Sequence, residues 1–495
     1  MKSITLMSLL LVFTLVSGAP RAQADEATNQ VKTLTLGECI QRALQSNLEI
    51  KSERINPTIG TWGVVGAQGV YDPTAAGSIN YQDSVTPQDP WQPTLKEQQL
   101  QSSLSLAGKL PTGATYDLSA ADTRLSGNVV TNFLFTGSAG VSLSQPLLKN
   151  FGLGVNAAAI RIARASRSIA IQNFVQLVMS KMSEVSTAYY ELVYAIENHK
   201  AALETRELAR QLLEENRQRE KIGTMSRLDV IQAESGVASS EQNVILTART
   251  IKDNENTLKR LICQQVGEFR GLSLVPVNYP VVQMIATDVA RSTRTALQMR
   301  ADYLSAKHAV EKQNILVQFN RNQLWPEIDL QGSYGLNGRS RDGFDNLVDN
   351  TAGGDHPAWA VGMAVTVPLG NRQARANYHT AQLQAEQQLL SLKELEQDII
   401  VQVDNAVGHV ETNLKSVEAA EAANRLAQES LDAEKEKLLA GTSTTFLVLQ
   451  AQSQLAAARS AEIRARADYS ESLVALDLAE GTILQKNNVV LDEKF

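Results

Sequence analysis

The sequence predicts a mixed α/β membrane protein built from two internal repeats, each a group of β-strands followed by one very long helical hairpin. Two stretches, 147–275 and 369–495, contain none of the 13 prolines and are dominated by helix-forming residues. Ahead of each stretch, alternating apolar and polar residues predict strands. No apolar segment after residue 24 is long enough for a spanning helix, so entry into a membrane would have to use strands.

The first 24 residues have the pattern of a signal peptide. Lys2 forms a short basic region, residues 4–16 are an apolar core, and Ala22-Gln23-Ala24 fits the small-x-small cleavage pattern. The apolar run is well short of the ~20 residues that a spanning helix needs, which favours a cleaved peptide over an anchor. Asp25 would be the new N-terminus, and without a cysteine there a lipid anchor is not expected.

Composition excludes several classes of protein. The hydrophobic fraction of 43% and charged fraction of 20% are those of an ordinary folded chain. A net charge of -7, with no basic run among aromatics, argues against a nucleic-acid partner. Cys39 and Cys263 are the only cysteines. They can form a disulfide in an oxidising compartment or remain two free buried thiols, and their spacing does not decide between these.

The first hairpin is expected over about 157–266, reversing at Gly223. Residues 157–222 would span roughly 100 Å at 1.5 Å per residue. Apolar residues step by four and three along it, which is heptad spacing and favours helices wrapped along one another: Ile171, Val175, Val178, Met182, Val185, Tyr189, Leu192 and Ile196. The apolar stripes are narrow, so such helices need neighbours, including helices of other subunits.

The second hairpin, over about 371–480, repeats the first and reverses at Gly441. Gly441 lies 218 residues after Gly223, and Ala451 lies 218 after Ala233. The Pro-Leu pairs that precede the helices, at 146–147 and 368–369, differ instead by 222. The duplication therefore carries about one helical turn of insertion.

Strands are expected ahead of both hairpins. Alternation occurs over 71–84, 97–108, 113–123 and 137–147, and again on both sides of a Gly/Asp/Asn-rich loop at 339–356. Short turns at one end and long loops at the other are typical of outer-membrane barrels. The four tryptophans (Trp62, Trp91, Trp325 and Trp359) lie in or beside these segments, where an interfacial aromatic belt would use them. The alternative is a soluble β-domain with core aromatics.

These segments give a domain plan. It consists of a signal peptide (1–24), a first repeat (25–285, strands about 71–147 and hairpin about 157–266), a second repeat (286–484, strands about 326–368 and hairpin about 371–480) and a C-terminal tail (485–495).

The chain resembles the TolC family of outer-membrane efflux and secretion proteins over nearly all of its mature length. Leu34-Thr35-Leu36-x-Glu38 through Asn47 is similar to the family's N-terminal helix, and Ala296-Leu297-x-x-Arg300-x-Asp302 to the opening of the second repeat. Ser144-Gln145-Pro146-Leu147 and Val367-Pro368-Leu369 resemble the strand-to-helix junctions. The order and spacing of these phrases make the resemblance specific.

The resemblance implies a homotrimer in the outer membrane, with its strands pooled in one β-barrel and its helices in an α-helical barrel across the periplasm. It implies a passive exit duct for drugs, metals or polypeptides, serving a periplasmic adaptor (membrane fusion protein) and an inner-membrane pump or exporter. Outer-membrane lipid would surround the strands. The family's usual count is four strands per protomer, whereas this chain offers six; the 97–123 hairpin either inserts, giving eighteen strands, or folds outside the membrane.

The resemblance also suggests where to look for a gate. Asp229 matches a position where acidic residues constrict the closed pore; capping of the returning helix by Ser226 and Asp229 is the alternative. At the second tip Leu447 and Gln450 stand where acidic ring residues would be expected, and Ser443 stands where an arginine often locks the closed state. We therefore hypothesise a constriction at Asp229, Leu447 and Gln450 that relies on packing and amide contacts.

The hairpin tips are the expected adaptor-docking surface, with simple backbone reversal at the glycines as the alternative. They comprise Gly223, Thr224, Met225 and Ser226 in the first copy and Gly441, Thr442 and Ser443 in the second.

No constellation predicts catalysis, a cofactor or a metal site, because the five histidines have no metal-ligand spacing with one another or with the cysteines. The chain is therefore not expected to be an enzyme. The rival function is a secreted periplasmic coiled-coil adaptor or structural spacer.

Overall fold

The computed structural model describes residues 30–87, 94–128, 133–265, 271–277 and 287–491. The expected signal peptide (1–24), Trp91 and the last four residues of the expected tail lie outside the described residues.

The described chain is a six-stranded sheet joined to a long helical body. Its elements are, in order, β1 (Gln30–Leu34), α1 (Leu36–Ser46), α2 (Leu48–Glu53), α3 (Ile55–Gln68), the 3-10 turn η1 (Gly69–Tyr71), β2 (Thr74–Thr86), β3 (Leu95–Lys109), β4 (Thr115–Gly127), β5 (Leu134–Pro146), α4 (Leu153–Asn156), α5 (Ala158–Lys221), α6 (Arg227–Ile262), β6 (Leu272–Pro276), α7 (Val289–Met299), α8 (Ala301–Asn322), β7 (Glu327–Ser340), α9 (Phe344–Ala352), β8 (Pro357–Thr366), α10 (Arg372–Leu439), α11 (Thr445–Glu480) and α12 (Ile483–Lys486).

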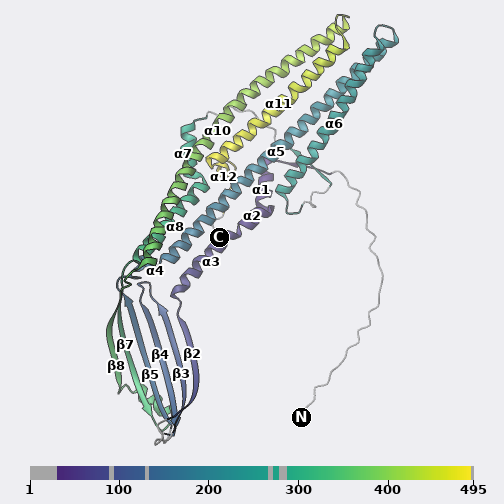
Figure 1. Ribbon diagram of the computed structural model, residues 1–495. Coiled ribbons are helices and arrows are strands. Elements are labelled where there is room, and N and C mark those ends of the chain that lie inside the picture. The colour runs from purple at the N-terminus through teal and green to yellow at the C-terminus, as the bar shows by residue number, and fades with distance from the viewer. Residues whose placement is uncertain (1–29, 88–93, 129–132, 266–270, 278–286, 492–495) are drawn as a thin grey trace, which may run out of the picture.

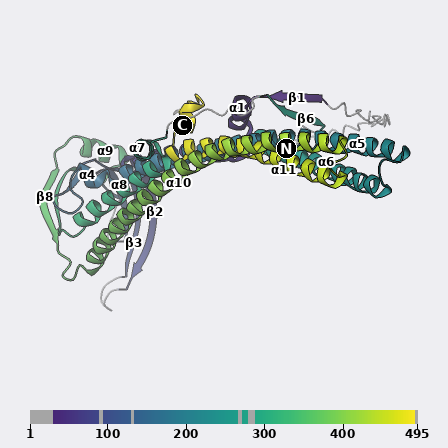
Figure 2. The same ribbon diagram turned by 90° about the horizontal axis from the view of Figure 1, so that it is seen from above.

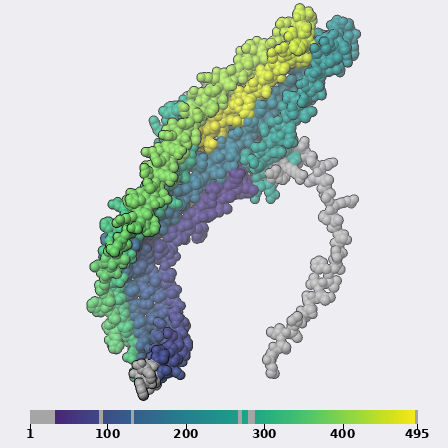
Figure 3. Space-filling view, viewed as in Figure 1, coloured from purple at the N-terminus to yellow at the C-terminus, as the bar shows by residue number. Residues whose placement is uncertain are grey.

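The molecule is elongated, with the sheet at one end and both hairpin tips at the other (Figure 1). Each repeat runs through strands into a long hairpin, α5–α6 in the first and α10–α11 in the second. The predicted mixed α/β fold of two internal repeats is confirmed. The space-filling view shows the two hairpins side by side, with α10 forming one long edge and α11 between α10 and α5 (Figure 3).

The sheet is one antiparallel array in the order β2-β3-β4-β5-β7-β8. It joins the two repeats where β5 pairs with β7, from Phe135 opposite Ser340 to Pro146 opposite Asp329. The β3–β4 hairpin lies in the middle of this array, paired on both sides. Of the four or six strands left open by the sequence, the described sheet contains six.

The two hairpins are copies that differ in one arm. The returning helices α6 and α11 both have 36 residues. The outgoing helices have 64 residues in α5 and 68 in α10. α10 is therefore four residues (68 − 64) longer than α5. The offsets of 218 and 222 place four more residues between the Pro-Leu pair and the tip in the first copy, and these lie ahead of the helix, because α5 begins 12 residues after Pro146 whereas α10 begins four residues after Pro368.

The heptad stripe on α5 forms the main core. Val178, Val185, Tyr189 and Leu192 have no exposed surface and pack with α1, α6 and β6. Burial of side chains of this size contributes roughly 1.5–3 kcal/mol each. The matching stripe on α10, including Val403 and Val410, forms a second core with α7 and α11.

Short helices continue the bundle where the returning helices end. α3 packs on α5, and α8 packs between α5 and α10. Both junctions use a side chain at a helix start: Asn47, the N-cap of α2, donates to the Leu261 carbonyl at 3.0 Å, and Arg300, before α8, donates to the Ala479 carbonyl at 3.3 Å. The two copies thus satisfy the last carbonyls of α6 and α11 in the same way.

Two features differ from the sequence-based expectation. β1 and β6 form a separate parallel pair beside α1, on the flank of the helical body (Figure 2). The 339–356 segment, expected to be a loop, contains helix α9, because its apolar residues Phe344, Leu347, Val348 and Ala352 recur at helical spacing.

Candidate functional site

The six-stranded sheet has one apolar and one polar face. We define the apolar face by the odd-numbered residues of β2, β5 and β8 and the even-numbered residues of β3, β4 and β7, which the register places on one side. All exposed large hydrophobic residues of the described strands lie on it: Ile79, Tyr81, Val85, Leu104, Leu106, Leu118, Val141, Leu143, Leu330, Tyr334, Trp359, Val361, Met363 and Val365. An exposed apolar surface of this extent marks an interaction site.

The opposite face, here called the polar face, carries short polar side chains. Examples are Ser78 and Ser103, whose hydroxyl oxygens lie 2.9 Å apart across β2 and β3. Gln101 and Gln331 lie on the same side. A sheet with such opposite faces fits a boundary between a hydrocarbon medium on one side and water on the other.

At the other end of the molecule, the two hairpin tips have the same backbone geometry. Gly223 and Gly441 adopt φ of +79° and +76°. The next residues, Thr224 and Thr442, each donate both the backbone N–H and the hydroxyl to a carbonyl five residues earlier, with backbone distances of 2.9 Å in both tips. This Schellman-type closure requires the left-handed conformation that glycine adopts without steric cost.

The returning helices begin differently. Ser226 accepts from the Asp229 N–H at 3.3 Å, and the Asp229 carboxylate accepts from the Ser226 N–H at 3.2 Å, which completes a capping box. In the second copy, Thr444 accepts from the Leu447 N–H at 3.4 Å, and Leu447 occupies the position that corresponds to Asp229 (229 + 218 = 447). The second cap therefore lacks its returning carboxylate.

The constriction residues predicted from the sequence lie on the first turn of α6 (Asp229) and the first two turns of α11 (Leu447 and Gln450). Asp229 is half-buried, whereas Leu447, 42% exposed, and Gln450 are exposed. Met225 packs against a small core shared by both tips, which comprises Leu212, Leu431, Leu438, Val448, Ala451 and Leu455. The structure thus brings the two tips together as one packed unit.

Ser443, the position of an expected lock, bonds within its own hairpin. Its hydroxyl donates to the Glu434 carboxylate, which also pairs with Lys437 at 3.1 Å. The Ser443 hydrogen bond, followed by the Lys437 contacts, lowers the pKa of Glu434.

One contact between the tips was not predicted from the sequence. Asn216 of α5 has no exposed surface, and its amide donates to the hydroxyl of Thr445 on α11 at 3.1 Å and to the Asp229 carbonyl on α6 at 3.3 Å. Further from the tips, Gln452 donates to the Leu208 carbonyl at 3.4 Å, and Arg459 pairs with Glu204 at 2.7 Å. Thr445, Gln452 and Arg459 step by seven along α11, a signal that was available in the sequence.

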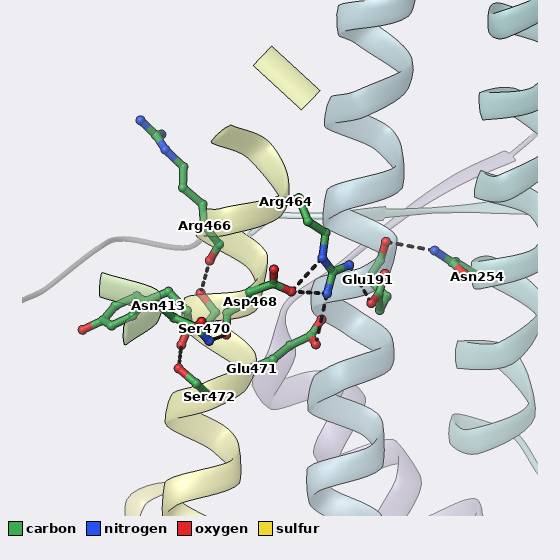
Figure 4. A network of polar contacts seen from close by, with 10 residues as sticks. Glu191, Asn254, Asn413, Arg464, Arg466, Asp468, Ser470, Glu471 and Ser472 are labelled. Carbon is green, nitrogen blue, oxygen red and sulfur yellow. Dashed lines mark hydrogen bonds and ion pairs between the residues drawn. The ribbon is translucent and has the colours of Figure 1, made fainter. Parts of the chain in front are cut away.

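A polar cluster joins the two hairpins nearer the middle of the body (Figure 4). Arg464 of α11 pairs with Glu191 of α5 at 2.7 Å, with Asp468 and, at 3.5 Å, with Glu471. Burial, and after it the charge of Glu191, raises the pKa of Glu471 to about 7. One Glu471 oxygen is buried without a hydrogen-bond partner. This cluster is a polar joint between the two repeats.

The described residues contain no helix that is both long and apolar enough to cross a membrane. No group of three or more His, Cys, Asp or Glu residues among them is arranged to hold a metal ion.

Comparison with known proteins gives consistent matches. The family model described as outer membrane efflux protein matches residues 98–264 and 293–482. Outer membrane efflux protein BepC of Brucella suis biovar 1 (strain 1330) is 24% identical over 459 residues, which cover 90% of this chain and 85% of that protein. Outer membrane protein TolC of Vibrio cholerae serotype O1 (strain ATCC 39315 / El Tor Inaba N16961) is 22% identical over 358 residues, or 71% of this chain and 78% of that protein.

Solved structures share the fold. The outer membrane protein VceC from Vibrio cholerae superposes with a TM-score of 0.66 at 18% identity, covering 90% of this chain and 96% of that one. The Campylobacter jejuni CmeC outer membrane channel gives 0.66 at 18% identity, covering 93% and 90%.

Proposed function

The chain belongs to the outer membrane efflux protein family, and from this premise we propose that it is the outer-membrane duct of an export machine. The observation that carries the proposal is the pair of opposite faces on the sheet. The apolar face, with Tyr334 and Trp359 paired on it, would meet lipid, and the polar face would line the path of the cargo. The duct would catalyse nothing, and the energy for export would come from a partner pump.

The functional unit is a homotrimer. The sheet ends in two unpaired edges, β2 and β8, and an exposed strand edge needs a partner or cover. Pairing β2 of one protomer with β8 of the next would close eighteen strands (three times six) into one barrel. The narrow apolar stripes on the long helices fit the same assembly, because each helix would meet neighbours around a hollow tube.

The hairpin tips would form the periplasmic entrance. Asp229, Leu447 and Gln450 would constrict it, and the tip residues from Gly223 to Ser226 and from Gly441 to Ser443 would dock a periplasmic adaptor. This fits the exposure of both glycine turns and the packing of both tips on a shared core. Opening would separate α10–α11 from α5–α6 at the Asn216–Thr445 contact.

Fractionation and electrophysiology test the proposal. The protein should enter the outer-membrane fraction, migrate as a heat-modifiable trimer and give single-channel currents in planar lipid bilayers. Recovery in the soluble periplasmic fraction without channel activity would instead support the rival spacer function and overturn the duct.

A further inference from the structure

Helix α9 is docked on the apolar face of the sheet. Leu347, 2% exposed, lies over Gly137, where an added Cβ would come within 3.2 Å of it. Thr351 lies over Gly338 so closely that a Cβ there would be 2.0 Å from its hydroxyl. Gly137 and Gly338 are direct partners across β5 and β7. This glycine pair makes room for the helix, and Asn350 fixes it by donating to the Arg339 carbonyl at 3.0 Å.

The helix is amphipathic and leaves part of its apolar side uncovered. Its apolar residues lie at spacings of three and four, while Asp345 and Asp349 occupy the other side. Phe344 and Val348, one turn apart, remain 50% and 49% exposed. α9 lies at the strand ends farthest from the helical body, since β5 begins and β7 ends beside it. A short helix of this kind fits the boundary between headgroups and acyl chains.

Between α9 and the sheet lies a cavity of about 820 Å³. Its floor on the apolar face is made of the small residues Gly77, Ser102, Ala120, Gly137 and Ala139 together with the half-buried Asp122, and its apolar walls are Ile79, Leu104, Leu336, Phe344, Leu347 and Val348. The volume lies within the ~300–1,000 Å³ that bound organic ligands occupy.

We propose that this cavity holds an acyl chain of a lipid in the outer leaflet of the outer membrane, with α9 as the interfacial helix that covers it. The inference rests on the proposed function, because it needs the apolar face to meet lipid. The cavity is continuous with that face, through Ile79 and Leu104, which are 76% and 64% exposed. At this face the surrounding medium consists of hydrocarbon chains, so a chain is the occupant that fills the space and covers the apolar walls.

Photocrosslinking in vesicles tests the site. The trimer is reconstituted with phosphatidylcholine that carries a diazirine on one acyl chain, irradiated, and mapped by peptide mass spectrometry. We expect labelling concentrated on 344–352 and 102–104, above that on the open apolar face of β8 (359–365). Ala120→Phe, which fills the cavity floor, should lower labelling of α9 at least fivefold. Ala75→Phe, on the same face but outside the cavity, should leave it unchanged.

The outcomes separate the two proposals. Labelling of β8 without labelling of α9, or equal labelling of α9 in wild type and Ala120→Phe, would overturn the acyl-chain site and leave the membrane-facing sheet intact. Absence of labelling on both would overturn the proposed function. Ser102→Phe fills the same cavity from β3, so it replaces Ala120→Phe if that variant does not form the heat-modifiable trimer.

Discussion

Asn216 and Thr445, 229 residues apart, form a fully buried hydrogen bond that ties the first hairpin to the second. The same Asn216 amide also donates to the Asp229 carbonyl, so one side chain joins α5, α6 and α11. The joint lies one turn inside the hairpin tips, where the proposed entrance would open. The strength of this contact should therefore set how readily the two hairpins separate.

Thr445→Val should raise the basal conductance of the closed channel. The change keeps the shape of the side chain but removes the hydroxyl that accepts from Asn216. Losing this hydrogen bond should destabilise the closed state by about 1 kcal/mol, which shifts the open-to-closed ratio about fivefold. Single-channel recording in planar bilayers measures it. Thr442→Val is the matched control, because that hydroxyl bonds only within α10 and its turn. Equal conductance in both variants would exclude Asn216–Thr445 as a closing contact.

Leu447→Asp should stabilise the start of α11. Thr444 already caps the helix, and a carboxylate three residues later would complete the box that Ser226 and Asp229 form in the first copy. A reciprocal cap is worth about 1 kcal/mol, so amide exchange over 445–449 should slow about fivefold. Leu447→Asn is the control for size. If Leu447→Asp leaves the amide exchange rates over 445–449 unchanged, the missing carboxylate is not what distinguishes the cap of α11 from that of α6.

Stability should depend on pH through Glu471. Its pKa is raised to about 7, so the folded protein binds a proton that the unfolded chain releases near its ordinary value of about 4.5. The contribution of Glu471 is therefore fully present below about pH 4.5 and is lost as pH rises from there to about 7. Glu471→Gln, which mimics the protonated form, should remove this part of the dependence.

Thermal unfolding followed by circular dichroism between pH 5 and 8 measures the Glu471 effect. The wild type should lose stability relative to Glu471→Gln as pH rises across this window. Glu204→Gln, at an exposed carboxylate that pairs with Arg459, serves as the control and should run parallel to the wild type. If the unfolding temperatures of Glu471→Gln and wild type change in parallel with pH, Glu471 is not protonated in the α5–α11 joint.

Cys39 and Cys263 should be unreactive thiols in the native protein. Both are buried and no disulfide joins them, and burial, with the charge of Glu38 next, raises the pKa of Cys39 to about 12. Thiolate is the reactive form, so a maleimide reagent should label neither cysteine until the protein is unfolded. Thr442→Cys, in an exposed turn, provides a positive control. Labelling in denaturant only after reduction would instead reveal a disulfide.

The sequence predicted the elements with strong local signals and missed those that depend on distant partners. The reversals at Gly223 and Gly441 followed from local composition. β1 and β6 were missed because each has five residues and pairs with a partner more than 200 residues away. Asp229 had two interpretations, and its capping role follows from the observed bonds to Ser226.

Side-chain chemistry at the joints was the least predictable part. Asn216 is an ordinary polar residue in a polar helix, and only its burial against Thr445 gives it a role. α9 is a different case, because its apolar spacing was present within a segment rich in Gly, Asp and Asn. In the prediction from sequence, the turn-forming residues of this segment outweighed a helical pattern that is only nine residues long.

Bulky substitution at the tip glycines should block export while the trimer still forms. Gly223 and Gly441 both adopt the left-handed conformation, yet no atom lies within 4 Å of an added Cβ. A side chain at either position would contact only solvent or a docked adaptor. Its cost to the fold would be about 1–2 kcal/mol of backbone strain. Gly223→Lys and Gly441→Lys should therefore abolish export if adaptors dock at the tips. Gly223→Asn and Gly441→Asn should retain most of the export activity, because asparagine tolerates the left-handed conformation.

Gly481 supplies the contrast that separates docking from folding. Its φ of +74° matches the tip glycines, but an added Cβ would lie 3.0 Å from the backbone of Met299 and Arg300. Gly481→Lys should therefore reduce the amount of folded trimer, because the junction between α11 and α8 cannot close. Export in a host that has the pump and adaptor but lacks its own outer-membrane duct measures the first effect, and trimer abundance on gels measures the second. Normal export by a protein that carries both Gly223→Lys and Gly441→Lys would contradict the proposal that the adaptor docks at the glycine turns.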